Sequence, residues 1–382
     1  MSGGVVLKTD SLSVGYKDKT VLRDIFLTVE KGRMICLLGP NGAGKSTVLH
    51  TLARLIEPIG GRIEMDGREL ASISVGELAK KISVVLTGNN LPGLTTVREL
   101  VAIGRSPYTG FFGRLTEKDE ELIDKSLHSV GAYDLRDRYC SELSDGEKQK
   151  IMIARALVQQ PQLILLDEPT SHLDVSRKVE VMRILNRLAA ENGIAVVMSM
   201  HDIDLAVKCS DYIVLIKNGS VKAAGTPEEI IRPGVIDELY DLKGAGYDEQ
   251  TGAVELAGGS SRDLFVFGRA GTATAVIRAA ARLGLGVGFG AAESYDIDAH
   301  TAKAVCIDHF IHEHGGESLE ALYEKTADAA VGYRLAVDSG FPMSDGDGLM
   351  KAVRDAEKRG LRVIGRQEYS SIEELIKIIK SQ

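Results

Sequence analysis

The sequence predicts an α/β protein with two domains, and three observations support this prediction. Short apolar runs alternate with segments of helical spacing, which is the pattern of strands followed by helices. The pattern stops at Gly258-Gly259-Ser260-Ser261 and starts again beyond it. A chain of 382 residues is long enough for two complete cores. We therefore expect one domain at residues 1–257 and a second at residues 258–382.

The composition is that of an ordinary globular protein and restricts the classes of function. Hydrophobic residues make up 44% of the chain and charged residues 26%. The net charge of −8 argues against a nucleic-acid partner, which normally needs a basic surface. No apolar run approaches the roughly 20 residues that span a bilayer. The four widely spaced cysteines suit reduced thiols. We expect a cytosolic protein that reaches a membrane only through a partner.

The N-terminal part of the chain reads as β-structure around one notable aromatic residue. Tyr16 precedes a phosphate-loop motif, so its ring could stack on a nucleobase, or it could be a half-buried strand residue. The sequence leaves both open. Strands or hairpin segments are expected at residues 5–9, 12–16, 25–29, 60–67 and 82–86.

The strongest motif is the segment 39–47, which fits G-x-x-x-x-G-K-[ST] between an apolar strand and a helix. Its glycines allow a tight turn whose N–H groups surround a phosphate at the helix N-terminus. Lys45 would reach the β- and γ-phosphates, and the Ser46 hydroxyl would ligate Mg²⁺. About 0.01 such matches are expected by chance, so we predict nucleoside triphosphate binding rather than an ordinary glycine turn. The predicted phosphate-binding residues are Gly39, Pro40, Asn41, Gly42, Ala43, Gly44, Lys45, Ser46 and Thr47.

From Thr95 the composition becomes helical, and the segment 143–149 forms a loop that runs into a helix. Ser144 and Gly146 would present a hydroxyl and backbone N–H groups at that helix N-terminus, which is a second arrangement suited to an anion. A serine N-cap before an ordinary helix is the alternative explanation.

The apolar run 163–166 ends in two carboxylates, Asp167 and Glu168. A buried parallel strand brings the residues at its carboxyl end to the ligand crevice, where the phosphate loop also lies. Asp167 would hold Mg²⁺ through water, and Glu168 would polarise the water that attacks the γ-phosphate. His201 ends a second apolar strand and could contact the γ-phosphate, although a single histidine is more often structural.

In order and spacing, these motifs resemble those of ABC-transporter ATPase subunits. The resemblance covers about the first 257 residues and implies an ABC-type fold with a mixed-sheet core, a β-subdomain and a helical subdomain. It also implies that Tyr16 is the A-loop residue and that Asp174 belongs to the nucleotide site. The matching motifs are Walker A at 39–47, the signature at 143–149, Walker B at 163–168, the D-loop at 171–174 and the switch histidine His201.

A finer resemblance points to the ATPase subunits of importers for iron–siderophore, haem and cobalamin. It rests on residues 96–108 and 110–115, and the endings at 225–230 and 247–252 are also typical of that group. The resemblance implies ATP and Mg²⁺ as ligands and a location at the inner face of the cell membrane. The implied partners are two integral-membrane permease subunits and, indirectly, an extracytoplasmic substrate-binding protein.

The family resemblance further implies a homodimer with shared sites. Lys45, Glu168 and His201 of one copy would be catalytic, while Ser144 and Gly146 of the second copy would close over the same γ-phosphate. Two rival functions are a soluble ABC-type ATPase of DNA repair or ribosome function and a regulatory switch that does not hydrolyse ATP. The first rival usually carries coiled-coil insertions or tandem ATPase units, and neither is found in this sequence.

Two departures from the family pattern bear on these expectations. Thr87 stands where the Q-loop glutamine is usual and is too short to reach both Mg²⁺ and water, so Asn89, Asn90 or a bridging water would take over. The signature has Asp145 and Glu147 where glycine and glutamine are common. An aspartate aimed at a triphosphate would repel it, so we expect the Asp145 carboxylate to point away.

Beyond residue 258 strands and helices alternate regularly, which predicts a small doubly wound parallel sheet. This part loosely resembles the Rossmann-like domain appended to some ATPase subunits of iron-type importers. The expected strands and helices lie at residues 264–267, 271–282, 285–289, 299–304, 305–311, 319–327, 329–337, 349–359, 361–364 and 372–379.

Two features of the second domain have alternative explanations. The loop 268–272 follows the first strand, where such folds bind phosphate, but tight strand–helix packing explains it equally well. Cys306, His309, His312 and His314 lie within nine residues and suggest a metal sensor. However, Cys306 and His309 fall on an expected strand and face opposite sides of it. A surface loop with polar histidines is therefore the preferred interpretation.

Overall fold

The computed structural model describes residues 4–17, 19–86, 94–110, 113–248, 251–342 and 347–382. These form two compact units, Met1–Ile230 and Ile231–Gln382. Within the described ranges, no helix combines the length and apolar character needed to cross a membrane.

The first unit is built on one large mixed sheet. The strand order is β6-β5-β1-β2-β11-β10-β4-β9-β8-β7, and β3 pairs with β1. The central strands β4 and β8 are buried at every residue, which explains why their sequences are uninterrupted apolar runs. The strands are β1 (Val5–Tyr16), β2 (Lys19–Ile25), β3 (Thr28–Glu30), β4 (Met34–Leu38), β5 (Gly60–Met65), β6 (Arg68–Glu69), β7 (Ile82–Val85), β8 (Leu163–Leu166), β9 (Ala195–Met200), β10 (Tyr212–Lys217) and β11 (Ser220–Gly225).

This sheet mixes both kinds of strand pairing, and β11 pairs antiparallel with β10 and parallel with β2. Strands β10, β4, β9, β8 and β7 are parallel neighbours, whereas β1 pairs antiparallel with β2, β3 and β5. The prediction of separate strands at 5–9 and 12–16 is wrong, because both belong to β1. Its register shifts near Leu12 and Val14, and Ser11 has a φ of 47°. Such a bulge lets one strand bend and pair with several partners.

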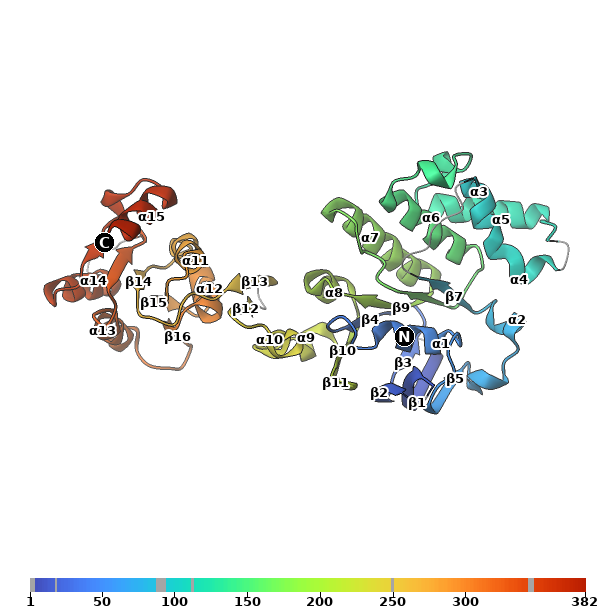
Figure 1. Ribbon diagram of the computed structural model, residues 1–382, viewed down its shortest axis with the longest axis horizontal. Helices are drawn as coiled ribbons and strands as arrows, with labels where there is room; N and C mark the ends of the chain where they lie inside the picture. Colours follow the sequence, from blue (N-terminus) through green and yellow to red (C-terminus); the bar gives the residue numbers. More distant parts are fainter. Residues whose placement is uncertain (1–3, 18, 87–93, 111–112, 249–250, 343–346) are drawn as a thin grey trace. The chain divides into compact units, whose positions relative to one another are not determined.

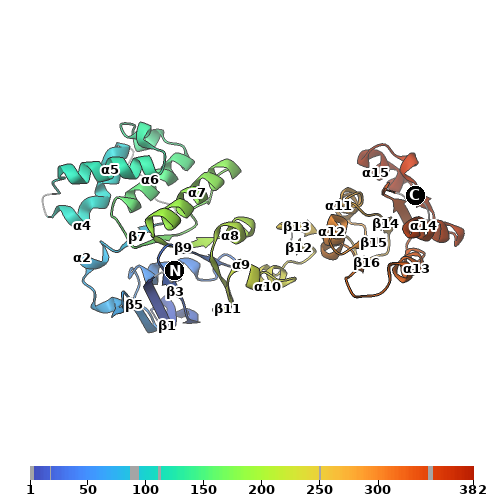
Figure 2. The same ribbon diagram turned by 180° about the vertical axis from the view of Figure 1, so that it is seen from behind.

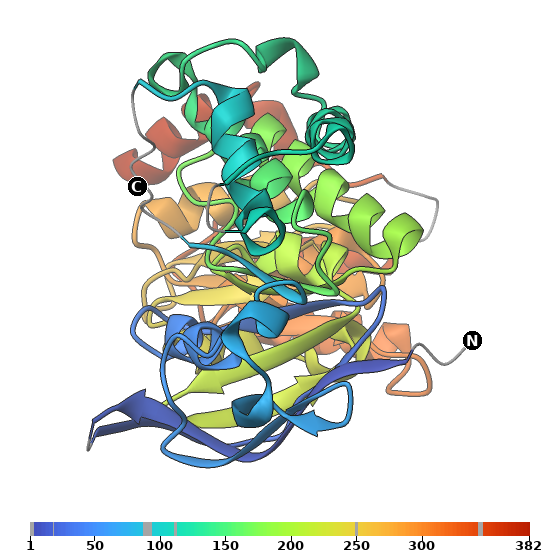
Figure 3. The ribbon, with the colours of Figure 1, turned by 90° about the vertical axis from the view of Figure 1, so that its right-hand side faces the viewer.

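Helices α3, α5 and α6 pack on one another and form a helical group, visible in Figures 1 and 2. Figure 3 shows this group above the sheet of the first unit. The helices are α1 (Lys45–Leu52), α2 (Val75–Leu78), α3 (Val97–Ala102), α4 (Ser106–Thr109), α5 (Glu117–Ser129), α6 (Asp145–Leu157), α7 (Val175–Asn192), α8 (Ile203–Cys209) and α9 (Pro227–Ile230), with short 3-10 helices at Leu70–Ser72, Ile103–Arg105, Tyr133–Leu135 and Cys140–Glu142. The expected helical subdomain is therefore present beside the mixed sheet.

The second unit contains a parallel sheet of order β16-β15-β14-β17-β18. Its elements are α10 (Val235–Tyr240), β12 (Ala245–Asp248), β13 (Ala253–Leu256), β14 (Leu264–Phe267), α11 (Thr274–Arg282), β15 (Val287–Glu293), α12 (Ile297–Val305), β16 (Asp308–His312), α13 (Leu319–Ala330), β17 (Leu335–Asp338), α14 (Gly348–Lys358), β18 (Val363–Ile364), a 3-10 helix at Arg366–Glu368, and α15 (Ile372–Ser381). The predicted doubly wound α/β fold is confirmed for this part of the chain.

Strand β14 shows how this sheet supports two cores. Leu264 and Val266 belong to the core formed with α11, α12 and α15, whereas Phe265 and Phe267 belong to the core formed with α13 and α14. Successive residues of a strand point to opposite faces, so a run of four apolar residues covers both sides. This explains why the strand is apolar throughout and does not alternate with polar residues.

A hairpin of β12 and β13 packs against α11 and α12 of the second unit. The Arg278 guanidinium donates from Nε to both carboxylate oxygens of Glu255, at 3.0 Å each. A side chain at Gly246 would place Cβ 2.8 Å from the Ala304 carbonyl oxygen, so the hairpin lies tightly on α12. Tyr247 and Asp248, from the stretch typical of the end of the ATPase unit, thus lie in a hairpin on the second α/β fold.

Candidate nucleotide-binding site

A hollow of about 570 Å³ lies in the first unit at the carboxyl ends of β4, β8 and β9. Carboxyl ends of parallel strands form one edge of a sheet, so residues distant in the sequence meet there. The lining residues are Tyr16, Val21, Asn41, Gly42, Gly44, Lys45, Ser46, Thr47, Glu168, Ser171, His172 and His201. The hollow therefore brings together the predicted phosphate loop, Tyr16, Glu168 and His201. Val21 was not predicted, and Ser171 and His172 belong to the predicted D-loop 171–174, of which only Asp174 was expected at the nucleotide site.

The phosphate loop connects β4 to α1 and needs glycine for two separate reasons. Gly42 and Gly44 have φ angles of 77° and 102°, a left-handed backbone that side chains disfavour. At Gly39 an added Cβ would lie 2.1 Å from the Ile216 carbonyl oxygen, so the adjacent strand leaves no room for one. The loop thus folds tightly and presents the N-terminus of α1 to the hollow.

Lys45 is held within the loop that it serves. Its side chain is only 5% exposed, and Nζ donates to the carbonyl oxygens of Gly39 at 2.6 Å and Pro40 at 2.9 Å. Burial lowers the pKa of Lys45, while the nearby Glu168 and Asp167 carboxylates act in the opposite direction. The ammonium group is positioned to bind phosphate oxygens at the loop.

Asp167 is anchored by two hydroxyl groups. Ser46 Oγ donates to Asp167 Oδ1 at 3.0 Å, and Ser199 Oγ donates to the same oxygen at 2.6 Å. The Ser46 hydroxyl and the Asp167 carboxylate provide oxygen ligands of the type that Mg²⁺ takes, alongside several waters. The residues present thus fit the predicted magnesium site.

Ser199 lies at the candidate site, and the sequence analysis did not identify it. It is fully buried on β9, and its Oγ also accepts a hydrogen bond from the Glu168 backbone N–H at 2.9 Å. The sequence feature that could have revealed Ser199 is a small polar residue near the carboxyl end of an apolar strand. Only the pairing of β9 with β8, which places Leu166 opposite Met198, shows that this serine reaches Asp167 and Glu168.

The Glu168 carboxylate contacts two side chains at the hollow. Its Oε1 lies against His201 Nε2, and its Oε2 accepts from Ser171 Oγ at 2.8 Å. Burial disfavours the ionised carboxylate, but the hydrogen bonds from His201 and Ser171 hold the pKa of Glu168 below its usual value. The carboxylate is therefore ionised near neutral pH and is able to accept a proton from water.

The signature residues Ser144 and Gly146 do not line this hollow. Ser144 is the N-cap of α6, and Glu147 completes a capping box with it. Glu147 Oε2 accepts from the Ser144 backbone N–H at 2.8 Å and from Ser144 Oγ at 2.7 Å. The side chain of Arg177 covers Gly146, where an added Cβ would lie 2.9 Å from Arg177 Cδ. Within one chain the signature serine thus caps its own helix.

The predicted site residue Asp174 and the signature residue Asp145, which departs from the family pattern, both lie at helix N-termini. Asp174 is the N-cap of α7 and accepts from the Arg177 backbone N–H at 2.8 Å. Asp145 Oδ1 lies 3.2 Å from Lys148 Nζ, and the Asp145 side chain is 71% exposed. Lys148 therefore partly compensates the negative charge that departs from the family signature. Thr87, Asn89 and Asn90 lie outside the described residues.

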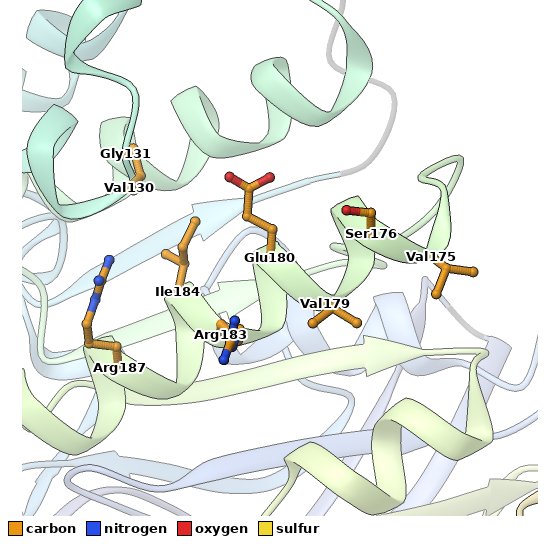
Figure 4. A pocket seen from close by; sticks show the side chains of 9 residues that line it. All are labelled: Val130, Gly131, Val175, Ser176, Val179, Glu180, Arg183, Ile184 and Arg187. Atoms are coloured by element: carbon orange, nitrogen blue, oxygen red, sulfur yellow. The ribbon is translucent and has the colours of Figure 1, made fainter.

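A second hollow of the first unit, about 630 Å³, runs along α7. Figure 4 shows Glu180 and Ile184 pointing toward the segment that carries Val130 and Gly131. Glu180 accepts from Lys150 and Arg177 at 2.9 Å each, so its carboxylate ties α7 to α6. None of the sequence-predicted site residues lines this hollow.

The histidine cluster of the second unit differs from the sequence expectation. The segment 305–311 is not a continuous strand: α12 extends to Val305, β16 begins at Asp308, and Cys306 lies in the connection. Cys306 and His309 therefore do not share a strand. His312 Nδ1 pairs with Glu293 Oε2 at 2.7 Å. Across the residues that the structure describes, no group of three or more His, Cys, Asp or Glu is arranged to hold a metal ion.

Comparisons with known proteins agree with this geometry. The family model for ABC transporters matches residues 22–171. An uncharacterised ABC transporter ATP-binding protein of Methanocaldococcus jannaschii is 45% identical over 275 residues, 72% of this chain and 95% of that protein. The petrobactin import ATP-binding protein of Bacillus subtilis is 40% identical over 62% of this chain and 93% of its own length. The cobalamin import ATP-binding protein of Halobacterium salinarum is 32% identical over 79% of this chain and 77% of its own length.

Solved structures of ABC transporters and of their ATP-binding cassettes also match part of this chain. An inward-facing metal-chelate type ABC transporter matches with a TM-score of 0.56 at 28% identity, covering 63% of this chain and 90% of the matched chain. A dimeric ATP-binding cassette bound to ADP and Pi matches with a TM-score of 0.51 at 28% identity, covering 58% and 98%. The chain therefore belongs to the ATP-binding subunits of ABC transporters: it is an ABC transporter ATPase, close to those of siderophore, iron and cobalamin importers, with an additional C-terminal α/β domain.

Proposed function

We propose that this ATPase energises an importer of a metal chelate or related large cofactor, of the iron–siderophore, haem or cobalamin class. The ATPase activity in this proposal rests on one observation: residues of the phosphate loop, Glu168 and His201 line the same hollow. The substrate class rests on relatives named for petrobactin import and for cobalamin import.

In this proposal the loop residues bind ATP before any chemistry occurs. The N–H groups at the start of α1 and the Lys45 ammonium hold the phosphates, and the half-exposed ring of Tyr16 stacks on the adenine. Ser46 and Asp167 would hold Mg²⁺, which neutralises charge on the β- and γ-phosphates when bound. Ser199 keeps the Asp167 carboxylate in place through its hydroxyl.

Glu168 is proposed as the general base. Its ionised carboxylate accepts a proton from the attacking water, and the contact with His201 fixes the direction of the carboxylate. Ser171 holds the second oxygen of Glu168. This arrangement keeps the base in position without a bound nucleotide.

We further propose that two copies share each site. Ser144 and Gly146 stand at the N-terminus of α6, away from the hollow of their own chain. The N–H groups and the hydroxyl at that end suit an anion, so a second copy can supply them to the γ-phosphate. Dimer closure on ATP and opening after hydrolysis would move two permease subunits docked near residues 87–115. A substrate-binding protein outside the membrane would act only through those permeases.

The second domain is proposed to be an accessory domain. We keep residue 258 as its proposed start, because the strand–helix alternation begins with β14 just beyond it. Every residue assigned to hydrolysis precedes residue 202, so the accessory domain supplies no catalytic group to the proposed mechanism.

Glu168→Gln tests both the base and the shared site. The variant should bind ATP normally but hydrolyse it at least about 10²-fold more slowly, because general-base contributions are of that order. With ATP it should also accumulate as a dimer in light scattering. Glu121→Gln, an exposed carboxylate on α5, is the matched control and should behave as the unmodified protein.

The possible results separate the proposals from one another. Unmodified protein that does not hydrolyse ATP would favour the regulatory switch. A Glu168→Gln variant that binds ATP yet stays monomeric would contradict the shared site while leaving the base assignment intact.

A further inference from the structure

The second unit has a hollow of its own, about 490 Å³, at the carboxyl ends of β14 and β15. This volume is within the range of small-molecule sites, and such sites commonly lie beyond the carboxyl ends of parallel strands. The lining residues are Arg269, Ala270, Ala291, Ala292, Glu293, Tyr295, Asp296, Ile297, Leu319 and Tyr323.

The inner wall of this hollow is small and apolar, and its outer wall is exposed. Ala291 and Ala292 line the hollow at the sheet and are only 1% and 2% exposed. Tyr295 is 82% exposed and Ile297 50% exposed. A large ring and an aliphatic side chain next to a hollow gain from being covered by a flat apolar ligand.

Glu293 adds a polar group to this apolar hollow. It is the last residue of β15, the second strand of the doubly wound sheet, and it follows the glycine-containing loop 268–272 by roughly 20 residues. An acidic residue at that position hydrogen-bonds ribose hydroxyls in dinucleotide-binding folds of this topology. His312 Nδ1 contacts Glu293 Oε2 at 2.7 Å and orients the carboxylate.

The loop that would bind a phosphate in such a fold is occupied by carboxylates of the chain itself. The Ala270 backbone N–H donates to Asp296 Oδ2. The backbone N–H groups of Ala273 and Thr274 donate to the two oxygens of Asp298 at 3.1 and 2.7 Å, and Asp298 is fully buried. A phosphate would have to displace these carboxylates or accept their repulsion at short range.

Arg269 does not offset the repulsion that the Asp296 and Asp298 carboxylates would exert on a phosphate. Its guanidinium forms an ion pair with Asp347 and donates to the Pro342 carbonyl oxygen at 2.6 Å. It also lies 3.5 Å from the Tyr323 hydroxyl and over the Phe341 ring at 5.4 Å. The positive charge of Arg269 is therefore paired with Asp347, and its side chain is held in place by Pro342, Tyr323 and Phe341.

We propose that this hollow binds a nucleoside, with its flat base against Tyr295 and Ile297, its ribose hydroxyls on Glu293, and no phosphate. The apolar walls suit the base, the carboxylate suits the hydroxyls, and the two aspartates exclude the phosphate. The accessory domain would thus sense a product of nucleotide breakdown rather than ATP, and the proposal does not depend on the transported substrate.

The test uses the full chain with Lys45→Ala, which weakens the nucleotide site of the first unit. Adenosine, guanosine, cytidine and uridine and their 5′-monophosphates are titrated by calorimetry. At least one nucleoside should bind with a Kd on the order of 0.1 mM, typical of a ligand of its size. Its monophosphate should bind at least about 10-fold more weakly, because of the repulsion from Asp296 and Asp298.

Three variants on the same background identify the site. Tyr295→Ala should weaken nucleoside binding about 10-fold, as loss of a stacking partner does, and Glu293→Gln should also weaken it. Ile307→Ala removes an exposed aliphatic residue outside the hollow and should change nothing. Asp296→Asn should reduce the ratio between the Kd of the monophosphate and the Kd of the nucleoside.

Three outcomes would overturn the proposal. The first is that no nucleoside binds at 10 mM, which is on the order of 100 times the expected Kd. The others are that a monophosphate binds as tightly as its nucleoside, or that Tyr295→Ala and Ile307→Ala have the same effect on binding.

Discussion

Both units contain a glycine-containing loop between a buried strand and a helix, yet the two loops have different surroundings. In the first unit the loop between β4 and α1 opens into a hollow of about 570 Å³ beside a buried lysine. In the second unit the loop between β14 and α11 has backbone N–H groups that donate to Asp296 and Asp298. The helix N-terminus favours an anion in both cases. In the first unit the helix N-terminus faces a hollow that a ligand can fill. In the second unit aspartates of the same chain take the place of the anion.

The difference teaches that a glycine turn after a strand does not by itself define a phosphate site. What matters is the charge that neighbouring segments bring to the turn. Lys45 is the first residue of α1, and its ammonium group hydrogen-bonds carbonyl groups of the first loop. Asp298 comes from α12, which packs beside α11, and occupies the second loop from outside. Four experiments test this difference between the two units, and the largest expected effect comes first.

Removing the basic residue of each loop should affect ATP binding very differently. Lys45→Ala should weaken MgATP binding about 10²-fold, because it deletes the ammonium group facing the phosphates. Arg269→Ala, the corresponding change in the second loop, should leave the affinity unchanged. Calorimetric titration of both variants tests this, and unchanged affinity in Lys45→Ala would mean that the Gly39 loop is not the main nucleotide site.

Removing the internal anion of the second loop should destabilise the second unit. Asp298→Ala leaves the N–H groups of Ala273 and Thr274 buried without their acceptor, which costs about 2 kcal/mol or more. Ser318→Ala removes an ordinary exposed N-cap of α13 and should cost about 1 kcal/mol. Urea unfolding followed by circular dichroism compares the two. Equal losses would show that Asp298 is no more than a conventional cap.

The acid side of the ATPase pH profile should depend on His201. Burial opposes ionisation of Glu168, yet hydrogen bonds from His201 and Ser171 hold the pKa of Glu168 below its usual 4.5. The proposed base works when ionised, so activity should persist until the pH falls through that lowered pKa. In His201→Ala the pKa of Glu168 should rise, and the acidic limb of kcat should move to higher pH.

His172→Ala serves as the control for this profile, because His172 lines the same hollow without a hydrogen bond to Glu168 among the described contacts. In His172→Ala the acidic limb of kcat should lie at the same pH as in the unmodified protein. An unmoved limb in His201→Ala would show that the contact with Glu168 does not control the base.

Removing the second domain should have the smallest effect. Truncation after Ala257 deletes no residue of the nucleotide site, so the basal ATPase rate should stay within about twofold. Truncation after Ile230 also removes the hairpin of β12 and β13, which packs on α11 and α12, and should give the same rate. A truncated protein that folds by circular dichroism but no longer hydrolyses ATP would show that the second domain completes the site.

Much of the fold and the main residues of the candidate site could be predicted from local sequence. The phosphate loop was recognisable because its glycines, Lys45 and Ser46 act within nine consecutive residues. Asp167 and Glu168 were recognisable because a wholly apolar strand ends at them. The second α/β fold was recognisable because strands and helices alternate at regular spacing. In each case the physical requirement is local, so a short stretch of sequence contains it.

Other features were decided only by tertiary structure. The role of Ser199 depends on the pairing of β9 with β8, and the His201 contact with Glu168 depends on the same pairing. The two expected strands at the N-terminus are one bulged strand because β1 pairs with three different partners. The second loop could not be judged from its own residues, because Asp296 and Asp298 reach it from the N-terminal end of α12. Hydrogen bonds between segments distant in sequence leave no local pattern, so they become visible only when the strands are assembled in a sheet.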